Sequence, residues 1–448
     1  MSTPARRPVG ALAALALCAA LLAAPPAGAD EDDDAEGALA TSDSALAGIL
    51  VTWVDDEERA EALYEGLGEL EELSVLVVDE GGRAVVDLDA DEARLPASTA
   101  KLVTAAAAWR LLGPDHRYVT RVHATGGIDD GVLDGDLVVA GSGDPALVSP
   151  VYAEEVFPAR PHTLLADLAE AVADAGVEEV AGRVRADVGG FADEPAAEGW
   201  PERYLTSLDA TLTAGLTVDG GRRLLERSGV TVAELAEDPA LEAATVLSRL
   251  LEEAGVDVAG TPARGSVPLG AVEVARVQSP PLEELLTHVV QRSDNAMADA
   301  IYRSLGVATG DGTWAGSEAA AIAALAGLDV DWTGATLRDG SGLSRDNRLS
   351  AAQLVALDRA LREREGAAWD ALMAVAGESG TLRRRWVDTE GEGRIRGKTG
   401  RLRDVTALVA HVEGAPSHDL AVLGRGPWEG LAAARELTDL LAESLAVP

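Results

Sequence analysis

The chain has 448 residues, 47% of them hydrophobic and 25% charged, and a formal net charge of −39 at pH 7. This length allows about two or three domains, and the apolar content is sufficient for globular cores. The negative charge argues against nucleic-acid binding, because the phosphate backbone requires a basic protein surface.

Residues 1–29 carry the pattern of a secretory signal peptide. Two arginines precede an apolar stretch over residues 11–24, and Ala27-Gly28-Ala29 is typical of a cleavage site. The apolar stretch is shorter than the roughly 20 residues of a membrane span. The single cysteine, Cys18, lies inside it, so the mature protein would have neither a disulfide nor a cysteine ligand for a metal. We therefore expect an exported protein, cleaved after Ala29 and located outside the cell or in the cell-wall space.

The first folded elements follow an acidic, alanine-rich leader at residues 30–44, which we predict to be disordered. An apolar run at Leu73–Val78 and an alternating run at Arg83–Asp89 enclose a glycine-containing turn. This pattern predicts two antiparallel strands.

A helix is predicted from Leu95 to Leu112, ended by Gly113-Pro114. Near its start, Ser98 and Lys101 form an S-x-x-K motif. Residues at i and i+3 share a helix face, so the hydroxyl and the amine can meet. Serine needs an adjacent base, and a buried lysine can supply one, whereas arginine keeps its proton. For this motif alone, a helix-capping serine and a surface lysine would be the simpler interpretation.

Lysine and asparagine are scarce in this chain, and the positions where they occur draw attention to the motifs. Only two of the 37 lysines and arginines are lysines, Lys101 and Lys398, and the only asparagines are Asn295 and Asn347. A GC-rich genome would explain the scarcity itself. The positions that retain an amine or an amide are therefore the informative ones.

Residues 116–212 differ from the rest of the chain in having short strand patterns and many turn residues. Strand patterns at Tyr118–His123 and Leu133–Ala140, a helix at about residues 162–175 and many turns predict an inserted, strand-rich domain.

Helical patterns return at about residues 239–254, 282–305 and 349–362. The second contains Ser293-Asp294-Asn295, an S-x-N motif whose hydroxyl could relay a proton and whose amide could bind a peptide carbonyl. Alone, this motif would be read as a polar break in a helix.

Three strands are predicted near the C-terminus, at residues 393–399, 405–412 and 420–423, before a final helix at 428–445. Lys398-Thr399-Gly400 lies on the first strand. Its cation can hold a carboxylate, and its glycine lets a substrate backbone lie close to the strand edge. A strand running into a turn is the alternative explanation.

The arrangement predicts an α/β (α+β) fold, a sandwich in which an antiparallel sheet made from both ends of the chain is flanked by helices. We assign residues 45–115 and 213–448 to this domain, with residues 116–212 inserted.

The three motifs, in this order, resemble those of active-site serine enzymes that recognise penicillin. The chain resembles class C low-molecular-mass penicillin-binding proteins, the D-alanyl-D-alanine carboxypeptidases and endopeptidases. That class carries extra domains between its first two motifs, as the long interval from Lys101 to Ser293 suggests here. Gly141–Pro145 and Asp339–Asn347 also look typical of it, and we expect the second stretch to be a loop near the rim of the cleft. The resemblance implies a serine transpeptidase-like sandwich.

The resemblance also implies catalytic roles. Ser98 would attack the carbonyl between two terminal D-alanines, and Lys101 would take its proton. Ser293, with Lys398 nearby, would pass a proton to the departing D-alanine.

Substrate binding is implied for four further positions. Asn295 would hold the substrate amide, and Thr399 would meet the substrate carboxylate together with Lys398. The oxyanion hole would consist of the backbone N–H groups of Ser98 and Arg401, beside Gly400. Arg401 departs from the family pattern, where threonine or serine is frequent, so the substrate preference is in question.

The expected partners are peptidoglycan stem peptides ending in D-Ala-D-Ala, with β-lactams as covalent inhibitors. No cofactor or metal is expected, because the histidines show no ligand spacing. A membrane anchor is not evident either, since the C-terminal stretch Leu431–Val447, which has a helical pattern, is acidic.

Two other functions share parts of this pattern. A β-lactamase of class A needs a glutamate in an E-x-x-x-N motif, but Gln291 and Leu343 precede the two asparagines by four residues. A non-catalytic module that binds peptidoglycan peptides would not need both lysines together with Ser98 and Ser293.

Overall fold

The computed structural model describes residues 48–50 and 57–447. The predicted signal peptide and the predicted acidic leader lie outside the described residues.

A six-stranded antiparallel sheet, in the order β16-β17-β18-β19-β1-β2, forms the centre of the main domain. Strands from the two ends of the chain meet where β1 pairs with β19 along its whole length. In β1, Val75 and Val77 face one apolar core, whereas Leu76 and Val78 face the other, as the two-residue period of a strand requires. The strands are β1 (Glu72–Asp79), β2 (Ala84–Leu88), β16 (Ala374–Val375), β17 (Ile395–Leu402), β18 (Val405–Val412) and β19 (His418–Arg425).

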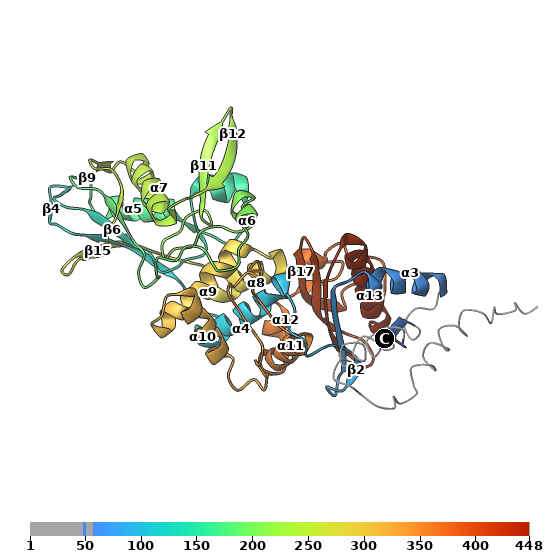
Figure 1. Ribbon diagram of the computed structural model, residues 1–448. Coiled ribbons are helices and arrows are strands. Elements are labelled where there is room, and N and C mark those ends of the chain that lie inside the picture. Colours follow the sequence, from blue (N-terminus) through green and yellow to red (C-terminus); the bar gives the residue numbers. More distant parts are fainter. Residues whose placement is uncertain (1–47, 51–56, 448) are drawn as a thin grey trace, which may run out of the picture.

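Helices cover both faces of this sheet, which is the predicted sandwich (Figure 1). On one face, α3 (Glu57–Gly68) packs against α13 (Trp428–Leu445). On the other face, α4 (Lys101–Leu111) runs through the middle of a helical layer, and its alanines at 105–108 are fully buried. Their small side chains let neighbouring helices approach closely. The other helices of the layer are α8 (Leu282–Arg292), α9 (Asn295–Thr309), α10 (Trp314–Ala324), α11 (Ala351–Glu365) and α12 (Ala367–Asp370).

The helix predicted at residues 282–305 is interrupted. α8 ends at Arg292, Ser293 adopts a left-handed φ of 61°, and α9 begins at Asn295. The apolar period continues across the break, and for this reason the pattern alone suggested one helix.

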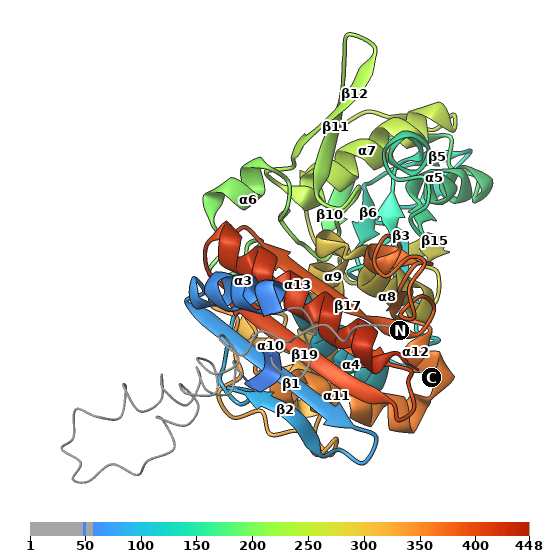
Figure 2. The same ribbon diagram turned by 90° about the vertical axis from the view of Figure 1, so that its right-hand side faces the viewer.

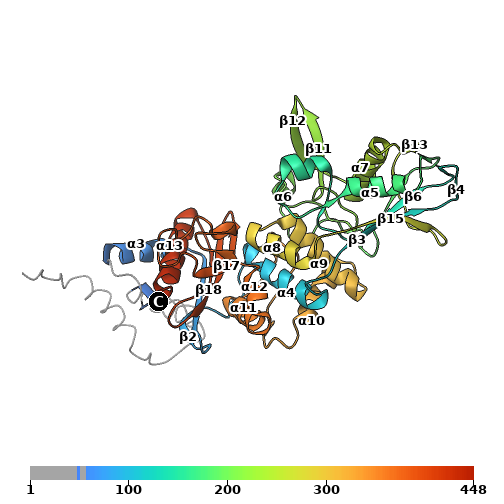
Figure 3. The same cartoon turned by 180° about the vertical axis from the view of Figure 1, so that it is seen from behind.

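The inserted region lies at the end of the molecule opposite α3 and α13 (Figure 3). Its core is a five-stranded sheet in the order β14-β10-β6-β3-β15, covered by α5 and α7. These elements are β3 (Val119–Ala124), β6 (Leu137–Ala140), α5 (Leu165–Asp174), β10 (Val184–Asp187), α7 (Pro239–Glu253), β14 (Ala263–Arg264) and β15 (Val272–Gln278).

Smaller elements complete this region, and the hairpin of β11 (Arg222–Arg227) and β12 (Val230–Leu235) projects from it (Figure 2). The remaining elements are β4 (Ile128–Asp129), β5 (Val132–Leu133), β7 (Leu147–Val148), a π-helical turn (Tyr152–Val156), β8 (Thr163–Leu164), β9 (Glu179–Val180), α6 (Glu202–Thr206) and β13 (Asp257–Val258).

The sheet of this region continues well beyond residue 212, the predicted end of the inserted domain. β15 pairs antiparallel with β3, and α7 contributes to the same apolar core. The packing therefore favours an end near Gln278, just before α8. A strand pattern shows that a segment is a strand, but it does not show which distant strand is its partner.

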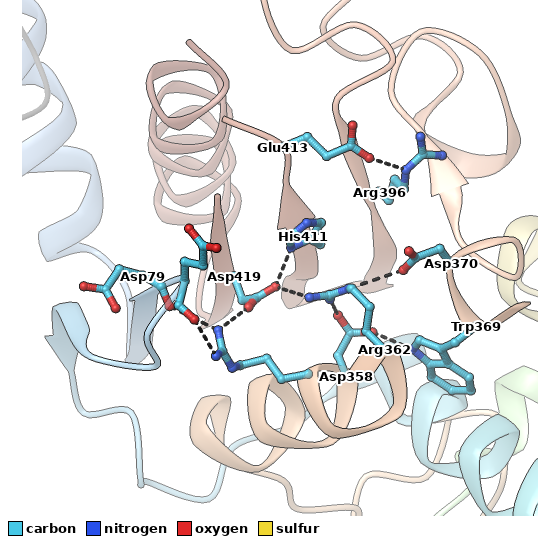
Figure 4. A network of polar contacts seen from close by, with 11 residues as sticks. Asp79, Asp358, Arg362, Trp369, Asp370, Arg396, His411, Glu413 and Asp419 are labelled. Atoms are coloured by element: carbon cyan, nitrogen blue, oxygen red, sulfur yellow. Dashed lines mark hydrogen bonds and ion pairs between the residues drawn. The ribbon is translucent and has the colours of Figure 1, made fainter. Parts of the chain in front are cut away.

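A network of charged side chains fastens α11 to the sheet (Figure 4). Asp419 on β19 accepts hydrogen bonds of 2.7 Å from Arg359 and from Arg362, and its Oδ1 also lies 2.7 Å from His411 Nδ1. Arg362 makes a second ion pair with Asp358, one helical turn away. The network links α11, β18 and β19, so it stabilises the contact between the sheet and the helical layer.

No helix within residues 57–447 has the length and apolar character needed to cross a membrane. In the same part of the chain, no three acidic, histidine or cysteine side chains gather in a way that could hold a metal ion.

Candidate active site

Ser98 lies on a short 3-10 turn, Ala97–Ala100, that leads directly into α4. The turn begins with Ala97 at a φ of 48°, in the left-handed region that costs a non-glycine residue energy. Pro96 and Ala100 occupy the two N-cap positions, and no side chain makes a capping hydrogen bond there. Ser98 is therefore not a helix cap, and its half-buried hydroxyl is directed to Lys101.

Lys101 is fully buried and has three oxygen neighbours. Its Nζ donates to Asn295 Oδ1 at 2.8 Å and to Ser341 O at 2.5 Å, and lies 3.1 Å from Ser98 Oγ. The first two oxygens can only accept hydrogen bonds. A neutral amine has two hydrogens for them and keeps its lone pair for the Ser98 hydroxyl, which is the arrangement a general base requires.

Burial lowers the pKa of Lys101 to about 8, although the carboxylates of Asp299, Asp339 and Asp294 oppose this change. Desolvation disfavours the charged ammonium, while nearby negative charge favours it. A pKa near 8 leaves an appreciable fraction of the amine neutral at physiological pH.

The loop Asp339–Asn347 supplies the carbonyl that holds Lys101. Asp299 Oδ1, on α9, accepts the N–H groups of Gly340 at 3.0 Å and Ser341 at 2.8 Å and so fixes this carbonyl. Residues 339–344 of the loop are buried, and Gly342 lies against the turn Ala97–Ala100, so this part of the loop lies inside the protein beside Ser98. The stretch looked like a solvated Gly/Ser loop, but its backbone groups are paired inside the protein.

Ser293 and Asn295 flank the break between α8 and α9. Asp294 caps α9 by accepting the N–H of Met297 at 3.0 Å. The Asn295 side chain accepts from Lys101 and donates from Nδ2 to the carbonyl of Asp209 at 2.9 Å. The amide therefore joins the α9 start both to the base and to the inserted region.

Lys398 is fully buried on β17, and its Nζ lies 3.0 Å from Ser293 Oγ and 2.6 Å from Thr399 O. Burial, followed by the charge of Lys101, depresses the pKa of Lys398 well below its usual range. The two amines are thus close enough for the protonation of one to influence that of the other.

The rest of the K-T-G strand borders the turn Ala97–Ala100, which carries Ser98. A Cβ at Gly400 would lie only 2.8 Å from Pro96 O, so the glycine allows this close approach. Thr399 Oγ1 donates to Thr381 Oγ1 at 2.8 Å, and the side chain of Arg401 is exposed.

The structure places five of the predicted site residues in two sets of contacts, Ser98–Lys101–Asn295 and Lys398–Ser293, which meet at the start of α9 because only Asp294 separates Ser293 from Asn295. Thr399, Gly400 and Arg401 follow on the same strand. Sequence reasoning missed the Ser341 carbonyl, Asp299 and Thr381. Only the first of these had a signal, since Ser341 lies within the family-typical stretch at 339–347.

This geometry can support acyl transfer. One hydroxyl has a base beside it, a second hydroxyl has its own amine, and both hydroxyls are half-buried whereas both amines are fully buried. Such pairs let one serine attack while the other delivers a proton.

Comparison with known proteins identifies relatives along most of the chain. The D-Ala-D-Ala carboxypeptidase 3 (S13) family matches residues 61–229 and 225–422. The D-alanyl-D-alanine carboxypeptidase of Actinomadura sp. (strain R39) is 32% identical over 410 residues, which cover 78% of this chain and 76% of the relative. Carboxypeptidase DacB of Mycolicibacterium smegmatis is 31% identical over 328 residues, 71% of this chain and 68% of the relative.

Solved structures share the fold. Penicillin binding protein 4 of Haemophilus influenzae aligns with a TM-score of 0.74 at 19% identity, over 85% of this chain and 99% of that chain. A peptidoglycan endopeptidase of Bdellovibrio bacteriovorus aligns with a TM-score of 0.51 at 18% identity, over 84% and 93%.

Proposed function

The chain belongs to the D-Ala-D-Ala carboxypeptidase 3 (S13) family, and we propose that it cleaves the bond between the terminal D-alanines of peptidoglycan stem peptides through an acyl-enzyme on Ser98. The family match confirms the resemblance predicted from the motifs. The observation that carries the proposal is the environment of Lys101, whose two acceptor-only partners leave its lone pair to the Ser98 hydroxyl.

In the first step, the Ser98 oxygen bonds to the carbonyl carbon of the penultimate D-alanine, and Lys101 takes the hydroxyl proton. The negative charge that develops on the carbonyl oxygen is stabilised by the backbone N–H groups of Ser98 and Arg401. The close contact of Gly400 with the nucleophile turn supports this pairing, because it brings β17 next to Ser98.

In the second step, the C–N bond breaks, and the leaving nitrogen takes the proton of Ser293. Lys398, 3.0 Å from Ser293 Oγ, replaces that proton. The carboxylate of the bound substrate favours a charged Lys398. Once Lys101 carries the proton of Ser98, its charge disfavours that of Lys398, so the second amine gives up its proton as the first gains one. Water then adds to the ester carbonyl and gives one proton to Lys398, while Lys101 returns its proton to the Ser98 oxygen as the acyl C–O bond breaks.

The substrate is held by groups beside these amines. Asn295 Nδ2 uses one hydrogen for the Asp209 carbonyl and keeps the other for a substrate carbonyl. Lys398 and Thr399 meet the C-terminal carboxylate. The exposed Arg401 is placed to add a second cation at the same end of the substrate.

A β-lactam would acylate the same serine, because its ring amide mimics the D-Ala-D-Ala bond. We also propose that the protein is exported by the signal at residues 1–29 and acts in the cell-wall space, where these peptides occur.

Replacement of the nucleophile tests this function. The mature protein should release D-alanine from a wall pentapeptide and should become covalently labelled by a fluorescent penicillin. Ser98→Ala should lose both activities and keep its far-ultraviolet circular dichroism spectrum, because the hydroxyl is half-buried and its removal leaves the core packing intact. Retained labelling would show that another residue is the nucleophile. Adding a cross-linked peptide dimer and weighing the products would separate carboxypeptidase from endopeptidase action.

A further inference from the structure

Arg160 of the inserted region reaches the S-x-N motif from outside the main domain. Its side chain is almost completely buried, and its Nε lies 3.1 Å from Asp294 Oδ2. The same guanidinium donates to Pro145 O at 3.0 Å and to the Tyr152 hydroxyl at 3.3 Å. These contacts fix the orientation of the arginine within its own region, so it presents a rigid cation to α9.

Asp294 is held from three sides. Its Oδ1 accepts the N–H of Met297, and its Oδ2 faces both Arg160 and His288 Nε2, at 3.1 and 3.3 Å. Burial alone would raise the pKa of Asp294, but Arg160 and His288 hold it below its usual range. The carboxylate therefore stays ionised and keeps its ion pair across the neutral pH range.

The residue before Asp294 needs such support. Ser293 has a φ of 61°, in the left-handed region that serine rarely adopts, and its hydroxyl lies 3.0 Å from Lys398 Nζ. If Asp294 moved, the neighbouring peptide could relax and carry the hydroxyl away from the amine.

We propose that Arg160 is a positioning residue, which anchors Asp294 and thereby holds the Ser293 hydroxyl where it can give its proton to the leaving nitrogen. Through Arg160, the inserted region then contributes to catalysis indirectly, because the arginine contacts Asp294 and not the substrate. A second tie from the same region, the Asp209 carbonyl on Asn295 Nδ2, supports the same end of α9.

This inference rests on the proposed function. It predicts that loss of Arg160 slows one step, the transfer of a proton from Ser293 to the leaving nitrogen. When an amide bond breaks, the nitrogen must take a proton, here from Ser293. When a thioester bond breaks, the sulfur leaves as a thiolate and needs no proton. Loss of Arg160 should therefore slow amide cleavage much more than thioester cleavage by the same acyl group.

The test compares the wild-type protein, Arg160→Met and Arg264→Met on an amide and a thioester with identical acyl groups. Arg264 is the matched control, because it also belongs to the inserted region and pairs with two carboxylates, Asp193 and Asp238, but lies at an exposed position. We expect Arg160→Met to lower kcat/KM for the amide by about 10- to 100-fold, and that for the thioester by less than about threefold. Arg264→Met should leave both values unchanged.

Equal losses on both substrates, or no loss on either, would overturn the assignment of Arg160. If Arg160→Met does not fold, Asp294→Asn decides the question. This variant keeps the shape of the side chain and removes the negative charge of the ion pair. It should lower kcat/KM for the amide selectively, as expected for Arg160→Met. Failure of the wild-type protein on both substrates would contradict the proposed function instead.

Discussion

Two lysines buried to the same degree can serve opposite ends of one reaction because their neighbours differ. Lys101 faces an amide oxygen, a backbone carbonyl and the Ser98 hydroxyl. Lys398 faces the Ser293 hydroxyl and the Thr399 carbonyl, and the charge of Lys101 adds to the effect of its burial. In the proposed mechanism the first amine accepts a proton and the second releases one, and because the two are coupled through space a proton gained by the first favours release by the second.

The protonation of Lys101 should set the pH dependence of acylation. Its pKa is lowered to about 8, and only the neutral amine can act as a base. Below pH 8 the acylation rate constant should rise by about tenfold per pH unit, and above it should level off. The measurement is the second-order rate constant for labelling by a fluorescent penicillin between about pH 5.5 and 9.5. A flat profile would mean that Lys101 is not the base.

Replacement by arginine separates the base from the positive charge. A guanidinium keeps its proton at any of these pH values, so Lys101→Arg should lower the acylation rate constant by about 10² to 10⁴-fold, the usual contribution of a general base. Near-normal labelling of this variant would show that another group takes the proton.

The sequence predicted candidate site residues that lie close together in the structure, but it did not predict their partners. Ser98, Lys101, Ser293, Asn295 and Lys398 belong to short motifs with definite chemistry, and they lie together. The Ser341 carbonyl is a backbone group that any residue would present, so no residue type reveals it. Likewise, nothing in the chain near Arg160 indicates that its partner lies at Asp294.

At the scale of elements, the loop Asp339–Asn347 packs closely against the turn that carries Ser98, the proposed nucleophile. Gly342 has a φ of 84°, and a Cβ at this position would lie 1.9 Å from the carbonyl oxygen of Ala97. The loop that holds Lys101 therefore presses directly against the turn that carries Ser98. Only glycine allows both the conformation and the contact.

Gly342→Ala should disturb this contact. The left-handed φ costs alanine about 1–2 kcal/mol, and the steric overlap adds about 1–3 kcal/mol. Gly334→Ala is the matched control, since its φ is 78° but its nearest neighbour would be 3.9 Å away. Urea denaturation should show a larger loss for Gly342→Ala, which should also label more slowly with penicillin. Equal stability losses would mean that the loop adjusts without strain.

Helices and strands with a regular apolar period could be predicted from the sequence, whereas those that are interrupted or weakly periodic could not. The strand predicted at Leu73–Val78 is β1, and the helix predicted at residues 349–362 is α11, because each has a strong local pattern. At Ser293 a left-handed φ interrupts a helical pattern, and α10 buries mainly small residues beside Trp314, which gives a weak periodic signal. Tertiary structure overrides local preference in the first case.

For the whole molecule, the decisive pairings join distant parts of the chain. β1 pairs with β19 and β3 pairs with β15, so each sheet is closed by segments that local patterns cannot assign to each other. This explains why the predicted sandwich was confirmed while the sheet of the inserted region extends past the predicted end at residue 212. The contact between the main sheet and its helical layer also depends on long-range partners, above all those of Asp419.

Arg362→Met should therefore destabilise the entire main domain. Removal of Arg362 leaves the buried carboxylate of Asp358 without a cation, while Asp419 keeps Arg359, and the loss of a partner from a buried pair costs about 3–5 kcal/mol. The control is Arg227→Met on the projecting hairpin, whose ion pair with Glu234 is solvent-exposed and should contribute at most about 1 kcal/mol. Urea denaturation at pH 7 compares the two variants, and equal losses would contradict a structural role for the network.

Acid should weaken the same network. Burial alone would raise the pKa of Asp419, but His411 and Arg362 bring it below its usual range. A carboxyl group whose pKa is depressed by folding stabilises the protein above its unfolded pKa of about 3.9, and this contribution disappears as the pH falls through the lower, folded value. The stability difference between wild type and Arg362→Met should therefore be largest near neutral pH and should shrink below about pH 4. A difference that stays constant from pH 7 into this acidic range would mean that Arg362 stabilises the domain through the packing of its stem and not through its ion pairs.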